Sequence, residues 1–447
     1  MKTLFRLSLL LSLCFVFIIP NVYCAELETA IPEEAGMSSE RLSRIDNLLQ
    51  GIVDKKTAKG AVAAVARHGK LVYLKAFGDM DEGKPMQKNT IFRICSQTKL
   101  VTSVAVMMLY EKGLFNLNEP ISKYIPEFKD TKVLIEDSSA PEGYKLVPPK
   151  REITIRDLLA HTSGISYAFW GRPFIAEWYL NAGVVDILYS PSGTIADNIK
   201  KLATCPLLFH PGERLEYGHN TDVLGYFVEI VSGMRLDKFF KERIFDPLGM
   251  NDTHFFLPSE KVSRLAAVYE PDGKGGLHKI EKKVARPSIL NPEIKTDIFD
   301  PSYPYKGPRT YFSGGGGLCS TALDYMRFCQ MILNKGELDG VRLLSPLTVE
   351  LMTRNHAGNV DTFLLDFIAG KGWQIAMGGA VLVDRDQVGH IIPNGTFCWG
   401  GYFSTNFDID FQNNMIYMLN TQRKSRTDPV EEFNKLRVLS HAAIIED

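Results

Sequence analysis

A serine and a lysine stand three residues apart directly before a long apolar segment, and this combination constrains the fold more than any other part of the chain. Ser96 and Lys99 are followed by residues 101–109, which read VTSVAVMML, and Gly113 is placed to end a helix. A helix that is apolar on most sides has to be buried. Because positions i and i+3 share a helix face, the lysine amine can reach the serine hydroxyl. The segment therefore predicts a central helix that begins with a serine and a lysine side by side.

The pair alone does not establish a catalytic site. Residue frequencies predict roughly one or two S-x-x-K tetrapeptides by chance in a chain of this length. A serine at a helix start is also an ordinary N-cap, and the lysine would then lie at the surface. Both interpretations are open on these residues alone.

Strand patterns lie at both ends of the chain. Residues 61–67 and 71–78 are apolar and flank a short glycine turn, which predicts a hairpin. Residues 400–411 alternate as one strand should, and residues 415–420 form a second strand after an Asn-Asn turn. Helices are expected over 38–53, 322–334 and 429–445. The pattern predicts an α/β (α+β) fold in which both termini build one antiparallel sheet flanked by helices.

The middle of the chain differs from the two ends. From about residue 126 to 300, helical patterns are interrupted by Pro-rich and Gly-rich connections, so we expect a mainly helical insertion. The sheet part then covers about 25–125 and 301–447 of a single catalytic domain. An aromatic cluster in the insertion could wall a pocket for an apolar substrate or be ordinary core. Its members are Tyr167, Phe169, Trp170, Phe174, Trp178 and Tyr179.

Residues 1–24 have the pattern of a secretory signal peptide. Lys2 and Arg6 precede an apolar stretch at 7–19, and cleavage is expected near Cys24/Ala25. That stretch is too short for a comfortable transmembrane helix, and no other segment is suited to span a membrane. We therefore expect a secreted or periplasmic protein whose mature chain covers residues 25–447.

Charge and cysteine content exclude several other classes. The formal net charge is −1, so the basic excess that would neutralise nucleic-acid phosphates is missing. Five cysteines follow the predicted signal, an odd number without C-x-x-C spacing, and the nine histidines show no metal-binding pattern. The sequence predicts no metal site, no cofactor and no nucleic-acid partner.

Five further segments carry a family resemblance. They are 153–165 (ITIRDLLAHTSGI), 211–217 (PGERLEY), 222–225 (DVLG), 314–320 (GGGGLCS) and 343–346 (LLSP). With the Ser-x-x-Lys tetrapeptide, they make the chain resemble the serine β-lactamase and penicillin-binding-protein superfamily. Within it, the chain is most similar to the class C β-lactamase-related group and its carboxylesterases.

The resemblance implies roles for three residues. Ser96 would be the nucleophile that forms an acyl-enzyme, which water later hydrolyses. Lys99 would act as general base together with Tyr217, which matches the tyrosine of the family's Y-x-N motif. The sequence leaves open which of the two side chains takes the first proton. His219 stands where that motif has asparagine, and the adjacent Asn220 could take over its role in substrate binding.

The family's third motif, K-T-G, is altered in this chain. The matching residues are Trp399, Gly400 and Gly401, so the lysine that helps to hold a substrate carboxylate is absent. The two glycines still allow close backbone approach. The N–H groups of Ser96 and Tyr402 are the expected oxyanion hole.

Three functions are compatible with these features. The W-G-G variant favours an exported serine hydrolase that cleaves small-molecule carboxylic esters. A β-lactamase or D-alanyl-D-alanine peptidase would use the family's commonest chemistry on β-lactam or peptide substrates. A non-catalytic binding descendant is the third alternative, because two motifs are altered. His161, in the H-T-S-G segment, is interpreted as a structural hydrogen-bonding residue.

Overall fold

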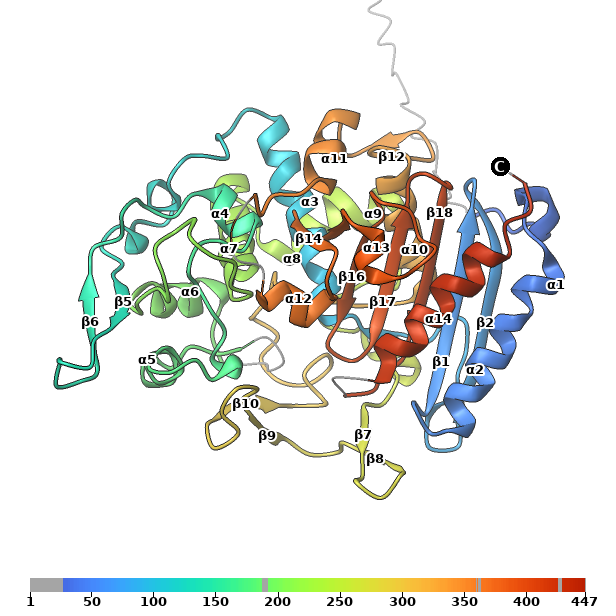
Figure 1. The fold of residues 1–447 in the computed structure, drawn as a ribbon, viewed down its shortest axis with the longest axis horizontal. Coiled ribbons are helices and arrows are strands. Elements are labelled where there is room, and N and C mark those ends of the chain that lie inside the picture. Colours follow the sequence, from blue (N-terminus) through green and yellow to red (C-terminus); the bar gives the residue numbers. More distant parts are fainter. Residues whose placement is uncertain (1–26, 187–191, 359, 361–362, 425–427, 447) are drawn as a thin grey trace, which may run out of the picture.

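The computed structural model describes residues 27–186, 192–358, 360, 363–424 and 428–446. The predicted signal peptide at 1–24 and its cleavage site lie outside these residues. An eight-stranded antiparallel sheet organises the fold, as predicted (Figure 1). Its spatial order is β14 (Trp373–Ala376), β15 (Gly379–Leu382), β16 (Phe397–Gly401), β17 (Thr405–Asp410), β18 (Met415–Asn420), β1 (Gly60–Arg67), β2 (Lys70–Asp81) and β3 (Lys84–Pro85).

The two ends of the chain meet in the middle of this sheet. β1 pairs with β18 in antiparallel register, with Ala64 opposite Met418. Successive side chains of a strand point to opposite faces, and β1 is buried on both of them. Val62, Ala64 and Ala66 belong to one hydrophobic core, and Ala61, Ala63 and Val65 belong to a second core on the other face. The sheet is therefore the middle of three layers.

Helices from the two termini cover one face of the sheet. They are α1 (Ser39–Leu42), α2 (Arg44–Asp54) and α14 (Asp428–Ala442), which contact one another. In Figure 1, α14 crosses in front of the sheet, and α2 and α1 lie at the right-hand side. Ser38 begins α1 as an N-cap that accepts a hydrogen bond from the backbone N–H of Arg41. The predicted helix over 38–53 is thus present, with a break at Ser43 between α1 and α2.

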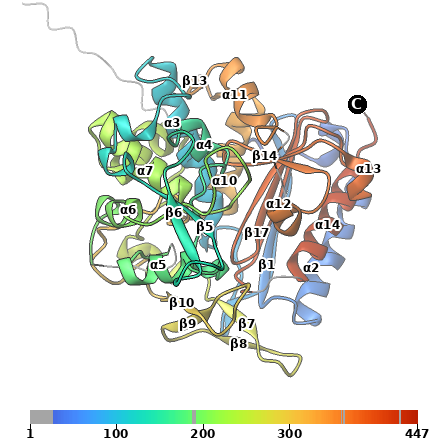
Figure 2. The same ribbon diagram turned by 60° about the vertical axis from the view of Figure 1, so that its left-hand side comes forward.

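The other face carries the large core and the helical half of the molecule, which Figure 2 separates from the sheet. α10 (Ala322–Leu333) packs directly on β18, and α3 (Thr98–Glu111) packs on α7 (Asn220–Ser232). The remaining helices are α4 (Ile155–Leu159), α5 (Ile175–Ala182), α6 (Ile195–Ala203), α8 (Leu236–Phe240), α9 (Asp246–Leu248), α11 (Pro346–Thr353), α12 (Phe363–Ala369) and α13 (Arg385–Val388).

Short two-stranded sheets accompany these helices, so the insertion is less purely helical than predicted. Three of them lie within 126–300: β5 (Val133–Glu136) with β6 (Tyr144–Val147), β7 (Tyr269–Pro271) with β8 (Leu277–Lys279), and β9 (Val284–Pro287) with β10 (Lys295–Phe299). Two more pair β4 (Phe92–Arg93) with β11 (Cys319–Ser320) and β12 (Glu337–Leu338) with β13 (Val341–Arg342).

One strand prediction was wrong. Residues 400–411 do not form one strand, because the chain reverses at 402–404 and β16 pairs with β17. Ser404 adopts a left-handed conformation, with φ at 63°, and its backbone N–H donates to the carbonyl oxygen of Gly401. Side-chain alternation continues through such a tight turn, and the sequence pattern therefore concealed the reversal.

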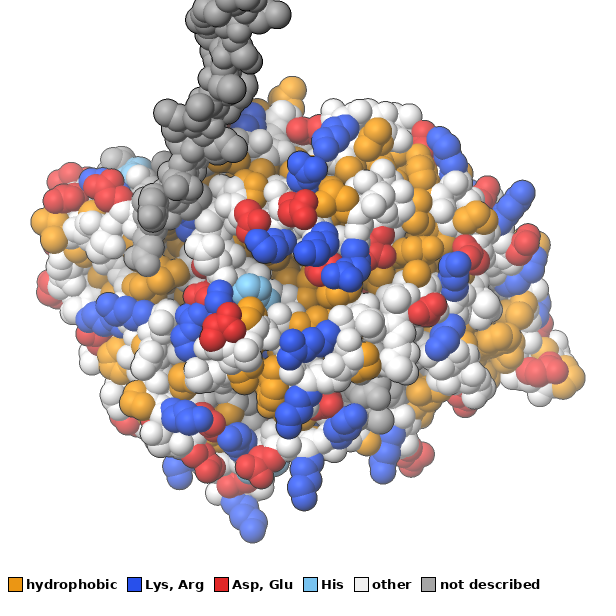
Figure 3. Space-filling model, turned by 180° about the vertical axis from the view of Figure 1, so that it is seen from behind, with side chains coloured by type: hydrophobic (Ala, Val, Ile, Leu, Met, Phe, Trp, Pro, Cys, Tyr) orange, Lys and Arg blue, Asp and Glu red, His pale blue; other side chains and the backbone are white. Residues whose placement is uncertain are grey.

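The surface offers no extended region of one charge in the view from behind, where Lys, Arg, Asp and Glu side chains are mixed (Figure 3). Within the described ranges, no helix has both the length and the apolar character needed to cross a bilayer. Among the same residues, no group of His, Cys, Asp and Glu side chains is arranged to hold a metal ion. All five cysteines after the predicted signal are buried, and no disulfide links any two of them.

Candidate active site

Ser96 and Lys99 lie together at the start of the buried central helix. Ser96 belongs to a single 3-10 turn, Cys95–Gln97, that leads directly into α3. Its side chain is 8% exposed, whereas that of Lys99 is 1% exposed. The Nζ atom of Lys99 lies 3.4 Å from the Oγ atom of Ser96. The alternative of an N-cap serine with a surface lysine is therefore excluded.

Lys99 is enclosed by a carbonyl group and two aromatic rings. Its Nζ atom donates a hydrogen bond of 2.5 Å to the carbonyl oxygen of Gly315. The centroid of the Tyr217 ring is 4.6 Å from Nζ, and that of Tyr167 is 5.6 Å away. Ring faces attract a cation at such distances. The amine is thus held close to Ser96 by a backbone carbonyl and two rings.

The glycine-rich loop that carries Gly315 is fastened to α3. The Oγ1 atom of Thr102 donates to the carbonyl oxygen of Gly314 at 2.7 Å, and the Leu318 N–H donates to the Oγ1 atom of Thr98 at 3.1 Å. Both threonines are fully buried. The loop and the helix therefore form one rigid unit around Lys99.

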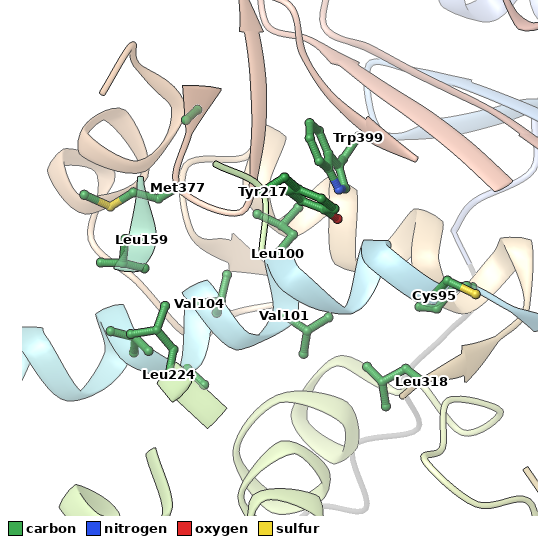
Figure 4. Close-up of a cluster of buried hydrophobic side chains, with 14 of the residues drawn as sticks. Cys95, Leu100, Val101, Val104, Leu159, Tyr217, Leu224, Leu318, Met377 and Trp399 are labelled. Atoms are coloured by element: carbon green, nitrogen blue, oxygen red, sulfur yellow. The ribbon is translucent and has the colours of Figure 1, made fainter. Parts of the chain in front are cut away.

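Tyr217 is positioned by the aromatic segment of the insertion. The indole N–H of Trp170 donates to the backbone carbonyl of Tyr217 at 2.7 Å. Next to it, Glu216 is 2% exposed and forms an ion pair of 2.9 Å with Arg172. The Tyr217 ring lies 5.6 Å from the Trp399 ring, and Figure 4 shows these two side chains together above α3. Residues 170–172 thus determine where the Tyr217 ring lies relative to Lys99.

The W-G-G segment forms β16 and lies against the start of α3. A Cβ atom on Gly401 would come within 2.3 Å of the carbonyl oxygen of Ile94 and 2.4 Å of the Oγ1 atom of Thr405. Such distances are far inside van der Waals contact, so only glycine fits. Trp399 is 6% exposed, and its ring fills the space beside Tyr217 where the family has a lysine.

His219 and Asn220 are buried behind the Ser–Lys pair. Asn220 accepts a hydrogen bond from the Ser163 hydroxyl, and its Nδ2 atom lies 3.0 Å from the Nδ1 atom of His161. Burial, together with the positive charge of Lys99, lowers the pKa of His161 to about 3, so its ring is neutral and Nδ1 accepts from Asn220. Both predicted substrate-binding side chains are engaged with protein groups, and their contact with substrate stays a prediction.

Most of the predicted aromatic cluster belongs to the core. Tyr167, Phe169, Trp170 and Tyr179 are buried, whereas Phe174 and Trp178 are partly buried at the edge of the core. A cavity of about 480 Å³ opens nearby, and its lining includes Leu208, Phe209, Arg214, Leu215 and Glu216. The cavity therefore adjoins the chain segment that carries Tyr217.

Sequence reasoning missed several residues of this site. Gly315 and Asp222 stand in segments that carried the family resemblance, but no role was predicted for them. Asp186 lies outside the quoted motifs and offered no signal. These groups come together only because α3, α7 and the glycine-rich loop pack against one another.

A fold of this kind, with a serine and a lysine adjacent at the start of the central helix, defines a serine hydrolase of the β-lactamase and penicillin-binding-protein superfamily. The model of the Beta-lactamase family matches residues 45–441. The chain therefore belongs to this family, as its motifs predicted.

Similar proteins include enzymes that act on esters. The chain is 30% identical to Esterase EstB of Burkholderia gladioli over 372 residues, which covers 82% of this chain and 87% of that protein. It is 29% identical to Lovastatin esterase of Penicillium rubens over 391 residues, or 83% and 90% of the two chains. The solved structure of EstCE1, a hydrolase with promiscuous acyltransferase activity, superposes on this structure with a TM-score of 0.77 at 28% identity. The match covers 90% of this chain and 99% of the EstCE1 chain.

Proposed function

We propose that the protein is an exported serine hydrolase that cleaves carboxylic esters through an acyl-enzyme on Ser96. The observation that carries this proposal is the 3.4 Å approach of the Lys99 amine to the Ser96 hydroxyl inside a buried, aromatic-walled site. A serine hydroxyl becomes a useful nucleophile only when a base takes its proton. The two esterases among the relatives support esters as the substrate class.

The proposed reaction uses groups of this chain alone. Lys99 as the neutral amine, or Tyr217 as the phenolate, removes the proton of Ser96 while Oγ attacks the ester carbonyl carbon. The backbone N–H groups of Ser96 and Tyr402 stabilise the resulting oxyanion. The alkoxide leaves and takes a proton from the Lys99–Tyr217 pair. Water then gives a proton to the Lys99–Tyr217 pair and attacks the acyl carbonyl carbon. The bond between that carbon and Oγ breaks, the carboxylic acid leaves, and Ser96 regains its proton from the pair.

The altered third motif supports esters over β-lactams and peptides. Penicillins and D-alanyl-D-alanine peptides carry a carboxylate, and Trp399 offers no charge to bind it. An apolar acyl or alcohol group is compatible with the aromatic wall of Tyr217 and Trp399.

Transfer of the acyl group to an alcohol is a second candidate function. An acyl-enzyme reacts with any nucleophile that reaches it, and a site in which Ser96 is only 8% exposed limits the access of bulk water. The acyltransferase activity named for EstCE1 supports this possibility. Ester product formed from p-nitrophenyl butyrate in the presence of a small alcohol would establish it.

Export is proposed from residues 1–24 alone. The motivating pattern is the pair of basic residues followed by an apolar stretch and a cleavage region. N-terminal sequencing of the protein recovered from the periplasm or medium tests it. A mature chain that starts near Ala25 is expected, and an intact Met1 on cytoplasmic protein would refute the proposal.

The central experiment compares p-nitrophenyl butyrate and nitrocefin as substrates of the mature protein and of Ser96→Ala. Ser103→Ala is a matched control, because Ser103 is a buried serine on α3, a short distance along the chain from Ser96. We expect rapid ester hydrolysis, little nitrocefin turnover, and loss of both only in Ser96→Ala. Full esterase activity in Ser96→Ala would refute the proposed nucleophile, and faster nitrocefin turnover would favour a β-lactamase.

A further inference from the structure

A histidine between two carboxylates is buried directly behind the Ser–Lys pair. The Nε2 atom of His219 lies 2.7 Å from the Oδ1 atom of Asp186, and its Nδ1 atom lies 3.5 Å from the Oδ2 atom of Asp222. The side chains of His219, Asp186 and Asp222 are exposed by 0%, 1% and 0%. Burying three ionisable groups is expensive unless they are paired, and none of them has a role in the reaction proposed above.

A continuous path of short contacts connects this cluster to Lys99. The Oδ1 atom of Asp222 accepts hydrogen bonds from the Ser313 hydroxyl at 2.6 Å and from the Gly315 N–H at 3.2 Å. The carbonyl oxygen of the same Gly315 accepts the hydrogen bond from Lys99 at 2.5 Å. A Cβ atom on Gly315 would lie 2.5 Å from the Oδ2 atom of Asp222, so only glycine permits this approach. The carboxylate thereby orients the residue whose carbonyl group holds the amine.

The two carboxylates that flank His219 favour its protonated form. Burial by itself would lower its pKa, but Asp186 and Asp222 outweigh that effect and raise the pKa to about 9. The rings of Tyr167 and Tyr179 pack against the imidazole at centroid distances of 4.5 and 6.1 Å. Tyr311 faces the two carboxylates, and Lys99 acts on Asp222 from α3.

We propose that Asp186, His219 and Asp222 form a buried carboxylate–imidazolium–carboxylate triad that positions Lys99 through Gly315 and sets the pH range in which Lys99 can accept a proton. The proposal rests on the proposed function, since it assumes that Lys99 acts as a base. In this proposal His219, whose side chain is 0% exposed, acts on Lys99 through Asp222 and Gly315 and is therefore a positioning residue.

The charge balance explains why a cation is needed at this place. Two carboxylates and one imidazolium carry a net charge of −1, which balances one lysine ammonium. His219 lies between the carboxylates. Without its positive charge, the negative charge of Asp222 acts on Lys99 uncompensated. Negative charge favours the ammonium form of a nearby lysine, which cannot accept a proton.

The test is the pH profile of kcat/KM for p-nitrophenyl butyrate in His219→Gln. We expect the midpoint of the activity rise to move to higher pH by about one unit or more, with lower activity at pH 7. His441→Gln is the matched control, because His441 is a buried histidine 2.8 Å from Asp410, which is on β17. The control variant should keep the wild-type midpoint of the pH profile, even if its thermal stability changes.

A lowered kcat with an unchanged midpoint in folded His219→Gln would overturn the proposal, because a purely structural role predicts that result. If that variant does not fold, histidine-selective NMR titration of the wild-type protein tests whether His219 is protonated. An imidazolium signal for His219 that persists at pH 8 supports the triad, and a neutral ring at pH 7 overturns it. The Ser96→Ala variant, assayed in parallel, separates a failure of the triad from a failure of the proposed esterase function.

Discussion

The amine of Lys99 donates its hydrogen bond to the carbonyl oxygen of Gly315, a residue 216 positions further along the chain. This bond joins the serine helix to the glycine-rich loop at the residue whose backbone N–H donates to Asp222. The position of the amine therefore depends on three separate segments of the chain.

Replacing Lys99 with methionine should abolish most ester hydrolysis. Methionine fills a similar buried volume but cannot accept a proton from Ser96, and a positioned general base typically contributes about 10²–10⁴-fold to the rate. We expect kcat/KM to fall by at least about 10²-fold in stopped-flow assays. A variant with native thermal stability and near-native kcat/KM would exclude Lys99 as the base.

Tyr217→Phe separates the hydroxyl from the ring. Phenylalanine keeps the ring beside Lys99 and Trp399, so the melting temperature should change little. Loss of a proton-transferring hydroxyl should lower kcat by about 10²-fold or more with a smaller change in KM. A lower melting temperature together with the lower activity would instead indicate that the hydroxyl has a packing role.

Gly401→Ala should disrupt the contact between β16 and the start of α3. The added methyl group would overlap the Ile94 carbonyl and the Thr405 hydroxyl. Overpacking of this kind typically costs about 1–3 kcal/mol, so we expect a lower free energy of unfolding in urea and impaired acylation by a fluorophosphonate probe. Gly51→Ala on α2 is the control, because no atom lies within 4 Å of the added Cβ atom.

The His219 triad should make stability depend on pH in the alkaline range. The pKa of His219 is raised in the folded protein from 6.5 to about 9, so its contribution is complete below about pH 6.5 and is lost as the pH rises through 9. A shift of this size corresponds to about 3 kcal/mol. Urea unfolding between pH 6 and 10 should show this decrease in wild type but much less of it in His219→Gln. Parallel curves for the two proteins would show that His219 is not protonated in the folded state.

Much of the fold followed from local sequence patterns. The hairpin of β1 and β2, the strand β18, the helices α10 and α14 and the buried helix α3 were all predicted near their observed ends. Each of these elements has a pattern of apolar residues with a period of 2 or 3.6, or an apolar run bounded by glycine, and such patterns need no knowledge of distant residues. The turn at 402–404 was missed because it preserves the alternation on either side.

Motifs and helix periodicity are local properties, and they were enough to predict the family, the fold class and the position of Ser96 and Lys99 on one helix face. The packing of distant segments placed Lys99 under Tyr217 and bonded it to Gly315. It also decided that Trp170 and Arg172 hold the segment of Tyr217 in place, and that His219 lies between two carboxylates. The physical reason is that burial and charge pairing depend on which segments pack together, and those segments are far apart in the chain.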